Sequence, residues 1–434
     1  MANAERIRHV AEIVKIHLEK KPVLVLSAMG DTTDHLLEAG EEALRGIVHA
    51  EKIEELHHKT IMELHLEDTA LILVRPLLEE LKSLLMGISL IKELTRRTKD
   101  YLVSFGERLS VRIAASYFNK LGINARAIDA WDGGFVSDSN FCSAELTEES
   151  WKLIPDKLLS AAEEGIVQVV TGFIAKDQKG NITTLGRGGS DLTATMLASA
   201  CGALELQVWK DVDGILSADP RIVKNARVIE TVTYEEAAEM ACYGAQVLHP
   251  RAMQPCIRSG TPVLFKNSYN PEAPGTRIVP SRTKKNCPIQ TITTRRNVTL
   301  VDIISSRMLG QYGFLAEVFA CFAKHGVSVD MVATSQVSIS LSLDAFHELS
   351  DLKKDLSRIA SVEIKTGKAI VTLIGDVGRS SEIMVRASKI CQLLGVQIQM
   401  ISQGTSKVNI SFVVDDKEAD EVVKGLHLDF FEAA

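Results

Sequence analysis

Short apolar runs alternate with longer amphipathic segments along the first two thirds of the chain. The apolar runs predict buried strands at Val23–Ser27, Ala125–Asp129, Gln168–Thr171, Leu204–Trp209 and Pro262–Lys266. Between them, segments such as Glu107–Leu121 and Leu192–Cys201 have the period of amphipathic helices. This alternation predicts an α/β domain in which helices cover both faces of a mainly parallel sheet. Ligands of such domains bind beyond the carboxyl ends of the strands.

Two further segments are predicted to be helical. The apolar positions of Met1–Glu19 follow helical spacing. The segment Glu38–Arg97 is long, charged and rich in leucine, so we expect helices that pack on the sheet or at a subunit contact. Its many charges favour a solvated face. We interpret its histidines, His57, His58 and His65, as surface residues without a metal-binding role.

A polar, proline-rich passage, Asn270–Pro288, is typical of a linker and predicts the end of the first domain. Beyond it the sequence repeats, because His325–Val332 is similar to Leu394–Ile401, about 70 residues later. Each copy follows a helical pattern and precedes a strand-like run, Val337–Leu343 or Val408–Val414. The repeat predicts two paired α+β modules of the βαββ type.

The composition excludes several classes of protein. With 434 residues, 46% apolar and 24% charged, the chain is predicted to be a soluble globular protein of two or three domains. A net charge of −7 and a pI near 5.9 argue against nucleic acid or an anionic membrane as the main partner. The seven cysteines have no Cys-x-x-Cys spacing, which favours reduced thiols over disulfides or a metal site and predicts a cytoplasmic location. No apolar run reaches membrane-spanning length.

The strongest candidate for a binding site is the loop Thr183–Asp191, between a strand-like and a helix-like run. Its three glycines allow positive φ and a close approach of the backbone to a ligand. Backbone N–H groups at a helix start favour an anion, and Arg187 offers a planar fork for a carboxylate or phosphate. The alternative is an ordinary turn before a helix, which uses the same residue types.

Three other motifs accompany this loop. Leu204–Trp209 leads into the run Lys210–Arg221, and the chain also contains Leu102–Glu107 and Gly244–Pro250. Together, and in this order, they resemble the amino-acid kinase family and the aspartate kinases in particular, most closely the plant-type form that has this activity alone. The resemblance extends over nearly the whole chain.

The resemblance implies a three-layer α/β/α kinase domain over residues 1–282 and a regulatory region over residues 283–434. In aspartate kinases this region consists of two ferredoxin-like ACT modules, the first inserted in the second. The first would span about residues 298–363, and the second about residues 288–296 plus 364–434. Ile289–Thr294 would thus add a strand to the second module. A homodimer through these modules is implied.

Such enzymes are phosphotransferases with a carboxyl acceptor. They transfer the γ-phosphate of ATP to the side-chain carboxylate of L-aspartate and produce 4-phospho-L-aspartate, the first step toward diaminopimelate, lysine, threonine and methionine. Because the attacking carboxylate is already ionised at neutral pH, the reaction needs positioning and charge neutralisation rather than a general base. The use of ATP implies Mg²⁺, and the sequence shows no metal-ligand spacing of its own.

The resemblance assigns the substrate site to Ser27, Thr33, Glu107, Arg187, Ser190 and Asp191. Glu107 would bind the α-ammonium group of aspartate and Arg187 its α-carboxylate, so that opposite charges hold the two ends of the molecule. Ser27 and Thr33 would line the pocket, and Arg187 and Asp191 would be the catalytic residues. The alternative for Glu107 is a place in the first turn of a helix, where the macrodipole favours an acid.

Four residues are expected to bind ATP: Lys210, Asp211, Arg221 and Gln246. Asp211 would accept hydrogen bonds from the ribose hydroxyls, and Arg221 would lie near the phosphates. Gln246 stands where many bacterial relatives have lysine and plant-type members have glutamine. The neighbouring Asp213-Gly214 has the alternative of a plain turn.

The family begins with a strand that runs into Lys-Phe-Gly-Gly-Thr-Ser, a motif that binds the ATP phosphates, and this chain shows neither. We expect a misplaced or truncated start, because the other motif residues are present. The loss of such a donor would raise the reaction barrier by roughly 3–4 kcal/mol. Two alternatives stay open: a catalytically impaired, amino-acid-binding regulator, and a kinase of another amino acid, such as glutamate or acetylglutamate.

The resemblance also implies an allosteric lysine site in the first ACT module, at Met308, Gly313, Phe314, Leu315, Ser328, Val329, Asp330, Thr334 and Ser335. Asp330 would face the ammonium groups of lysine, and a helix start would donate to its carboxylate. The alternative, an apolar packing corner, accounts for Phe314 and Leu315 but not for the polar residues. The effector would lie between the modules of two subunits. A role for S-adenosylmethionine is left open.

Overall fold

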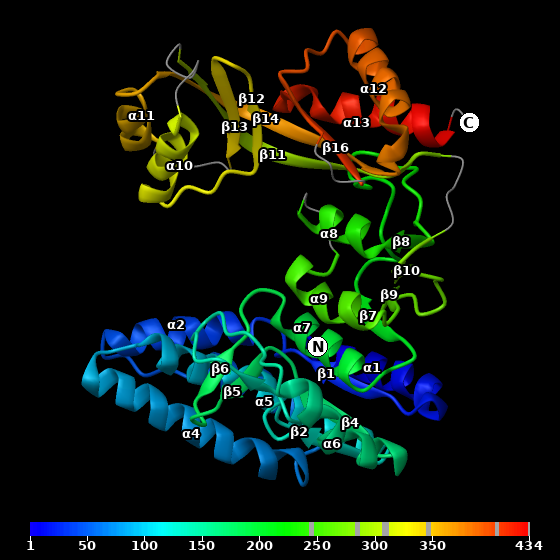
Figure 1. The fold of residues 1–434 in the computed structure, drawn as a ribbon. Coiled ribbons are helices and arrows are strands. Elements are labelled where there is room, and N and C mark those ends of the chain that lie inside the picture. Colours follow the sequence, from blue (N-terminus) through cyan, green and yellow to red (C-terminus); the bar gives the residue numbers. More distant parts are fainter. Residues whose placement is uncertain (243–246, 283–286, 306–311, 344–348, 404–407, 433–434) are drawn as a thin grey trace. The chain divides into compact units, whose positions relative to one another are not determined.

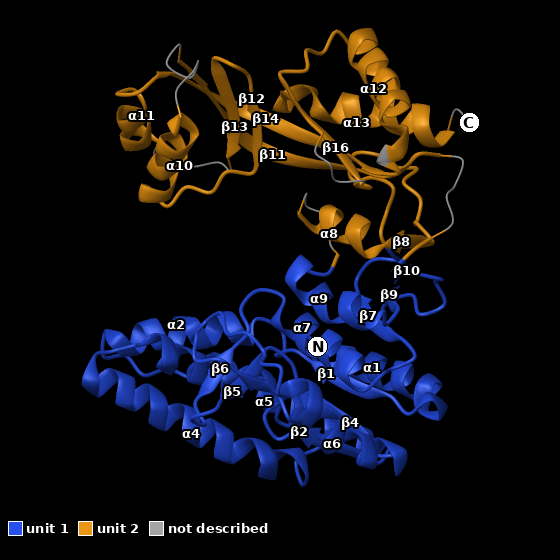
Figure 2. Cartoon of the chain, viewed as in Figure 1, with its two compact units in different colours: residues 1–214, 248–280 blue, residues 215–247, 281–434 orange. Residues whose placement is uncertain are grey.

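The computed structural model describes residues 1–242, 247–282, 287–305, 312–343, 349–403 and 408–432 (Figure 1). The chain divides into two compact units, residues 1–214 with 248–280 and residues 215–247 with 281–434 (Figure 2). The stretch 215–247 therefore groups with the C-terminal part of the chain, although residues of the first unit flank it on both sides. The linear domain boundary at residue 282 stays a prediction.

The strands of the first unit form short sheets. The central sheet has the order β1–β4–β2, all parallel, with β1 (Val23–Leu26), β4 (Val167–Thr171) and β2 (Ala125–Ile128). A second sheet contains β7 (Leu206–Lys210) parallel to β9 (Val263–Asn267), and β10 (Thr276–Val279) antiparallel to β9. In a third, β5 (Ile174–Asp177) pairs in parallel with β3 (Val136–Ser137) and antiparallel with β6 (Ile182–Thr184). The five predicted strands are confirmed, with ends within two residues of those expected.

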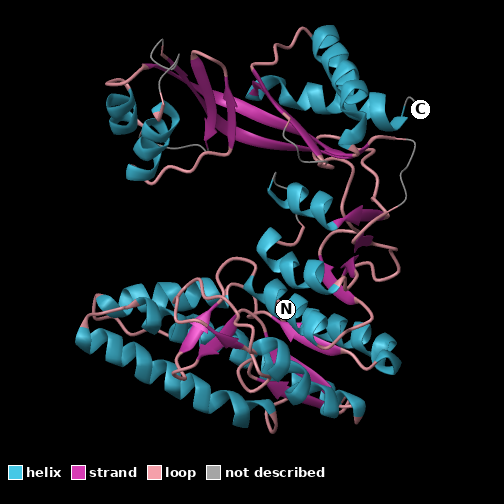
Figure 3. Cartoon of the chain, in the orientation of Figure 1, coloured by secondary structure: helices cyan, strands magenta, loops and turns pink. Residues whose placement is uncertain are grey.

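The helices of the first unit are α1 (Ala4–His17), α2 (Thr32–Leu44), α3 (Glu51–Glu63), α4 (Ala70–Ile91), α5 (Arg96–Lys120), α6 (Ser150–Glu163), α7 (Gly189–Ala200) and α9 (Pro250–Ser259), with a 3₁₀ turn η1 at Leu18–Lys20. On one face of the central sheet, α1 and α5 share a core in which Val111 and Val169 are buried. On the other face, α6 and α7 share a core with Met196 and Val170. Figure 3 shows helices on both sides of the strands of this unit. Because neighbouring side chains of a strand point to opposite faces, β4 contributes to both layers. The predicted α/β/α class is confirmed.

The start of α5 corrects one expectation about Glu107. The helix begins at Arg96, since the Thr95 hydroxyl oxygen accepts a hydrogen bond from the N–H of Thr98 at 3.2 Å and caps the helix. Glu107 therefore lies in the middle of a 25-residue helix and not in a first turn. The alternative reading of this residue, as an acid placed by the helix macrodipole, is wrong.

The helices expected within Glu38–Arg97 are confirmed as α3, α4 and the second half of α2. The interpretation of His57 as a surface residue is wrong, because its side chain is fully buried. Its Nδ1 lies 2.7 Å from the carbonyl oxygen of Ile53, while Nε2 has no hydrogen-bond partner among the described residues. Burial lowers the pKa of His57 to about 4, so the ring is neutral at pH 7.

Among the described residues, the second unit contains a six-stranded antiparallel sheet in the order β12–β13–β11–β14–β16–β15. Its strands are β11 (Ile289–Ile304), β12 (Met331–Thr334), β13 (Ser338–Leu343), β14 (Ser361–Gly375), β15 (Met400–Ser402) and β16 (Asn409–Asp415). The first half of β11 pairs with the second half of β14, and its second half pairs with β13 and the first half of β14. Ile292 consequently belongs to a core with Phe412, whereas Val301 belongs to a core with Val318.

The remaining elements of this unit are β8 (Thr231–Thr233), α8 (Tyr234–Cys242), α10 (Phe314–Lys324), α11 (Ser350–Leu356), η3 (Val377–Arg379), α12 (Ser380–Leu394), η4 (Asp416–Glu418), α13 (Ala419–His427) and the π-type turn η5 (Leu428–Glu432). The cores place α10 and α11 with the β13 module, and α12 and α13 with the β16 module. The predicted pair of α+β modules is confirmed. None of the helices in the described ranges is long and apolar enough to cross a membrane.

Candidate active site

The carboxyl end of the central sheet brings two predicted motifs together. Ser27 directly follows β1, and Ser190 lies in the first turn of α7. The Ser27 hydroxyl donates a hydrogen bond to Ser190 Oγ at 2.8 Å, although 163 residues separate the two in sequence. Two predicted substrate residues therefore meet at the edge where α/β sheets bind ligands.

The loop between β6 and α7 requires glycine at two positions. Gly188 has a φ of 68°, in the left-handed region that favours glycine. Gly189 has no room for a side chain, because a Cβ there would lie 2.6 Å from Cδ2 of Phe173. Between these glycines and β6, Arg187 is exposed, and its guanidinium makes no hydrogen bond or ion pair with any described residue. The loop thus presents a cationic fork whose donors are not used by any residue that the structure describes.

Glu107 is almost fully buried, with 3% of its surface exposed. Its Oε1 accepts a hydrogen bond from the N–H of Ala28 at 3.2 Å, which connects α5 to the loop after β1. Its Oε2 is buried and has no partner among the residues that the structure describes. Burial raises the pKa of Glu107 to about 8. Since an unpaired buried carboxylate oxygen is unfavourable, this arrangement suits a site that receives an ammonium group.

Asp191 and Lys210 form an ion pair between the first turn of α7 and the end of β7. Lys210 Nζ lies 3.3 Å from Asp191 Oδ2, and both side chains are partly exposed. A predicted catalytic residue and a predicted ATP ligand are therefore in contact, with the exposed Asp211 next in the chain. Asp213 accepts hydrogen bonds from the side-chain amides of Asn267 and Asn270, so it has the contacts of a structural turn.

Other predicted residues lie elsewhere. Thr33 is half-buried in the first turn of α2. Arg221 belongs to the second unit, where it is exposed and pairs with Asp219 at 2.6 Å. Gln246 and Met308 lie outside the described residues.

The predicted effector residues gather around α10 and β12. Gly313 has a φ of 89° and precedes α10, whose first residues are the buried Phe314 and the exposed Leu315. Ser328, Thr334 and Ser335 are exposed and Val329 is half-buried. Asp330 lies just before β12 and pairs with Arg295 at 3.2 Å. The carboxylate that was expected to face lysine therefore already has a cationic partner within the chain.

The sequence reasoning missed Gly172 and Phe173, which follow β4. Phe173 has a φ of 67°, unusual for a bulky residue, and its N–H donates to Thr193 Oγ1 at 3.1 Å. Gly172 leaves room for Ser190, since a Cβ at residue 172 would lie 2.6 Å from Ser190 Oγ. The available signal was a glycine directly after a buried strand, which marks a close backbone approach.

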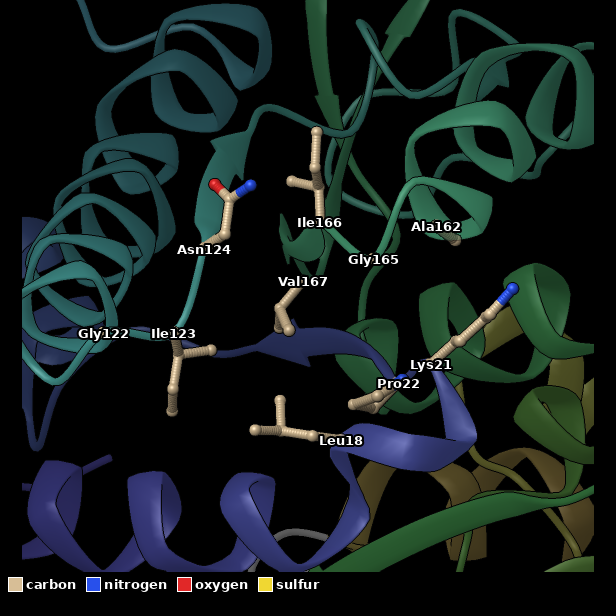
Figure 4. A pocket seen from close by; sticks show the side chains of 10 residues that line it. All are labelled: Leu18, Lys21, Pro22, Gly122, Ile123, Asn124, Ala162, Gly165, Ile166 and Val167. Atoms are coloured by element: carbon tan, nitrogen blue, oxygen red, sulfur yellow. The ribbon is translucent and has the colours of Figure 1, made fainter.

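A separate cavity lies at the amino ends of the same strands (Figure 4). Its volume is about 280 Å³, and its walls include Leu18, Lys21, Ile123, Asn124 and Val167. It contains none of the predicted site residues.

Comparisons with known proteins show the family of this chain. The sequence pattern of the "Amino acid kinase family" matches residues 1–267, and that of the "ACT domain" matches residues 301–347 and 371–430. Aspartokinase 1, chloroplastic, of Arabidopsis thaliana is 48% identical over 451 residues, covering 100% of this chain and 79% of that protein. The chain is an aspartokinase family member. The similarity to plant-type aspartokinases that the motifs predicted is thereby confirmed.

Solved aspartokinase structures share the fold. The structure of E. coli aspartokinase III in complex with aspartate and ADP, in the R-state, matches with a TM-score of 0.80 at 32% identity. The structure of the same enzyme with lysine and aspartate, in the T-state, gives a TM-score of 0.82 at 33% identity. Both matches cover 99% of this chain and 97% of the other.

Proposed function

We propose that this chain transfers the γ-phosphate of ATP to the side-chain carboxylate of L-aspartate and produces 4-phospho-L-aspartate. The observation that carries the proposal is a pair of groups in one unit that have no partner among the described residues: the buried Oε2 of Glu107 and the exposed guanidinium of Arg187. The Arabidopsis relative bears the name of this enzyme at 48% identity. The product belongs to the first step of lysine, threonine and methionine biosynthesis.

Glu107 and Arg187 hold the two ends of the substrate. The α-ammonium group donates to Glu107 Oε2, and the α-carboxylate accepts from the Arg187 fork. Ser27, Thr33 and Ser190 line the space between them. The free side-chain carboxylate then faces the nucleotide and needs no base, since it is ionised at neutral pH.

Lys210 and Asp191 serve the phosphoryl transfer. The Lys210 ammonium neutralises charge on the transferred group, and Asp191 keeps that ammonium in place at 3.3 Å. Asp211 and Arg221 contribute to ATP binding. The described residues contain no group of three or more acidic, histidine or cysteine side chains placed to hold a metal ion. A Mg²⁺ ion would arrive with the ATP phosphates and take at most one or two carboxylates from the protein.

We also propose that lysine binds the first ACT module and that two chains associate through these modules. Exposed apolar side chains on α10, β12 and β15 support the association: Leu315, Phe319, Val332 and Ile401. The E. coli enzyme has been crystallised with lysine. A cytoplasmic location remains an expectation from the thiols, while the Arabidopsis relative is chloroplastic.

The test is turnover of the purified 434-residue chain with ATP and L-aspartate, with the acyl phosphate trapped by hydroxylamine. We expect hydroxamate from aspartate and at most traces from glutamate or N-acetylglutamate. Glu107→Gln and Arg187→Ala should each raise the KM for aspartate at least about tenfold, because each removes a charged contact. Binding of aspartate without any hydroxamate would contradict the proposal and favour a non-catalytic regulator.

A further inference from the structure

A second buried carboxylate in α5, Asp100, has no role in the chemistry above. Only 1% of its surface is exposed. It accepts three hydrogen bonds: from the Thr184 hydroxyl at 2.6 Å, the Thr184 N–H at 3.0 Å and the Cys142 N–H at 2.9 Å. All three donors are uncharged, and such a set compensates the burial of a carboxylate.

Thr184 is the last residue of β6 and opens the glycine loop. The next residue, Leu185, is fully buried and is held from two sides. Its N–H donates to the Phe173 carbonyl at 2.8 Å, and its carbonyl accepts from Arg251 Nη1 at 2.9 Å. The backbone is therefore fixed up to Leu185, and Arg187 follows two residues later.

The same helix carries Glu107. Asp100 and Glu107 are seven residues apart, about two turns or roughly 10 Å along the axis, and so project from one face of α5. One rigid helix thus supports the predicted ammonium ligand directly and the loop of the predicted carboxylate ligand through Thr184.

We propose that Asp100 is a positioning residue that fixes the glycine loop on α5 and thereby sets the separation between Glu107 and Arg187. This inference rests on the proposed function of the site. The separation decides how the substrate is placed between the two charges, and a displacement of about 1 Å is enough to lower the rate of a well-oriented reaction up to about a hundredfold. Asp100 is thus a specificity determinant for the four-carbon diacid over its longer homologue, although it touches neither.

Thr184→Val tests the contact with a minimal change, since valine removes only the hydroxyl donor. We expect the KM for aspartate to rise about tenfold, with the KM for ATP within about twofold of wild type. The ratio of kcat/KM for aspartate over glutamate should fall several-fold. Thr184→Ser keeps the donor and should restore both values, and Asp100→Asn, which keeps one acceptor oxygen, should lie between wild type and Thr184→Val.

Asp177→Ala is the matched control. Asp177 is also a buried carboxylate, 4% exposed, that accepts hydrogen bonds from the Ser139 hydroxyl and from the N–H groups of Lys179 and Asn181 between β5 and β6. Its loss should lower thermal stability without changing the aspartate-to-glutamate ratio. An equal change of that ratio in Asp177→Ala, or an unchanged aspartate KM in Thr184→Val, would overturn the positioning role.

Hydrogen–deuterium exchange of residues 185–189 provides a readout that needs no turnover. We expect faster exchange of these amides in folded Thr184→Val, measured with the full chain, and wild-type exchange in Thr184→Ser. Unchanged exchange would refute the anchoring of the loop. If the wild-type protein lacks aspartate kinase activity while the exchange result holds, the proposed function fails and the anchor stands.

Discussion

Glu107 is proposed to bind the substrate, but its buried carboxyl group is unfavourable for the stability of the substrate-free protein. Burial raises its pKa to about 8, so the carboxyl is mostly protonated at pH 7 when no ligand is present. Only the carboxylate attracts an ammonium group, and a bound ammonium would in turn lower this pKa. Substrate binding and deprotonation are therefore linked at this residue.

The first prediction is a pH dependence of kcat/KM for aspartate. Because the free enzyme must lose the Glu107 proton, we expect a rise between about pH 6 and pH 8, approaching tenfold per unit on the acid side. Glu107→Gln should remove this limb and leave a low, flat profile. Initial rates over this range at saturating ATP are the measurement. If the rise of kcat/KM with pH is unchanged in Glu107→Gln, a group other than Glu107 causes it.

The same residue predicts a change in stability without substrate. The folded-state pKa lies above the unfolded value of 4.5, so the contribution of Glu107 is favourable at low pH and is lost as the pH rises through about 8. Glu107→Gln should therefore stabilise the substrate-free protein at pH 8, by up to a few kcal/mol, and change little near pH 4.5. Urea unfolding at the two pH values measures the difference. Equal effects at both would contradict the assigned burial.

At the scale of elements, α5 shows what the sequence could and could not predict. The apolar runs gave β1, β2, β4, β7 and β9, because buried parallel strands have few polar positions. The start of α5 was not predicted, since buried polar residues interrupt its apolar period: Asp100, Ser104, Glu107 and Ser110. The fold supplies partners for Asp100 and Ser104, whereas Glu107 Oε2 and the Ser110 hydroxyl have none among the described residues.

The residues of the candidate site can likewise be separated into those that the sequence could predict and those that it could not. Ser27, Glu107, Arg187, Ser190 and Asp191 could be named from motifs, since their residue types already express the chemistry. Asp100 and Phe173 could not, because their roles depend on contacts with residues 84 and 20 positions away. Such contacts leave no local pattern.

A prediction for α3 follows from the buried His57. Its folded-state pKa of about 4 lies below the usual 6.5, so its contribution to stability is present above pH 6.5 and is lost as the pH falls toward 4. This pKa difference corresponds to about 3 kcal/mol of unfolding free energy. In His57→Leu the unfolding free energy should fall less steeply between pH 6.5 and pH 4 than in wild type. His58 is exposed, so His58→Leu should keep the wild-type pH dependence. Denaturant melts at several pH values decide between them.

A chain of hydrogen bonds in the second unit yields a further prediction. Ser217 Oγ lies 2.9 Å from His427 Nε2, and His427 Nδ1 lies 3.1 Å from Glu432 Oε1. Ser217 and His427 are buried, so the chain connects the segment after residue 214 to the end of α13. His427→Phe should destabilise this unit by about 1–3 kcal/mol, because it leaves the buried Ser217 hydroxyl without this partner.

Hydrogen exchange gives the readout for His427→Phe. Exchange should become faster at the amides of Arg227 and Ile292, which donate to Ser217. Val423→Ala, a core change on the same helix, is the control and should not single out these two amides. If His427→Phe and Val423→Ala change the exchange of these two amides equally, the hydrogen bond between Ser217 and His427 does not stabilise them specifically.

At the scale of the whole molecule, regulation by lysine is the property to test. Thr334 is exposed at the end of β12, near the other predicted effector residues. We predict that Thr334→Ile weakens lysine binding about tenfold or more, because a polar contact is replaced by a branched apolar group. Calorimetry on wild type and variant, with the dimer checked by sedimentation, is the measurement. An intact wild-type dimer that binds no lysine would end this proposal.

The two long strands β11 and β14 run through both ACT modules, so each module contains only half of each of these strands. A stop codon or protease cut between the modules would leave half of each strand without a core to cover it. The regulatory region should therefore melt in a single transition, and either half expressed alone should be recovered as aggregate. Because the two modules share β11 and β14, neither could be removed or replaced without disrupting the other, and the region is expected to fold only as a whole.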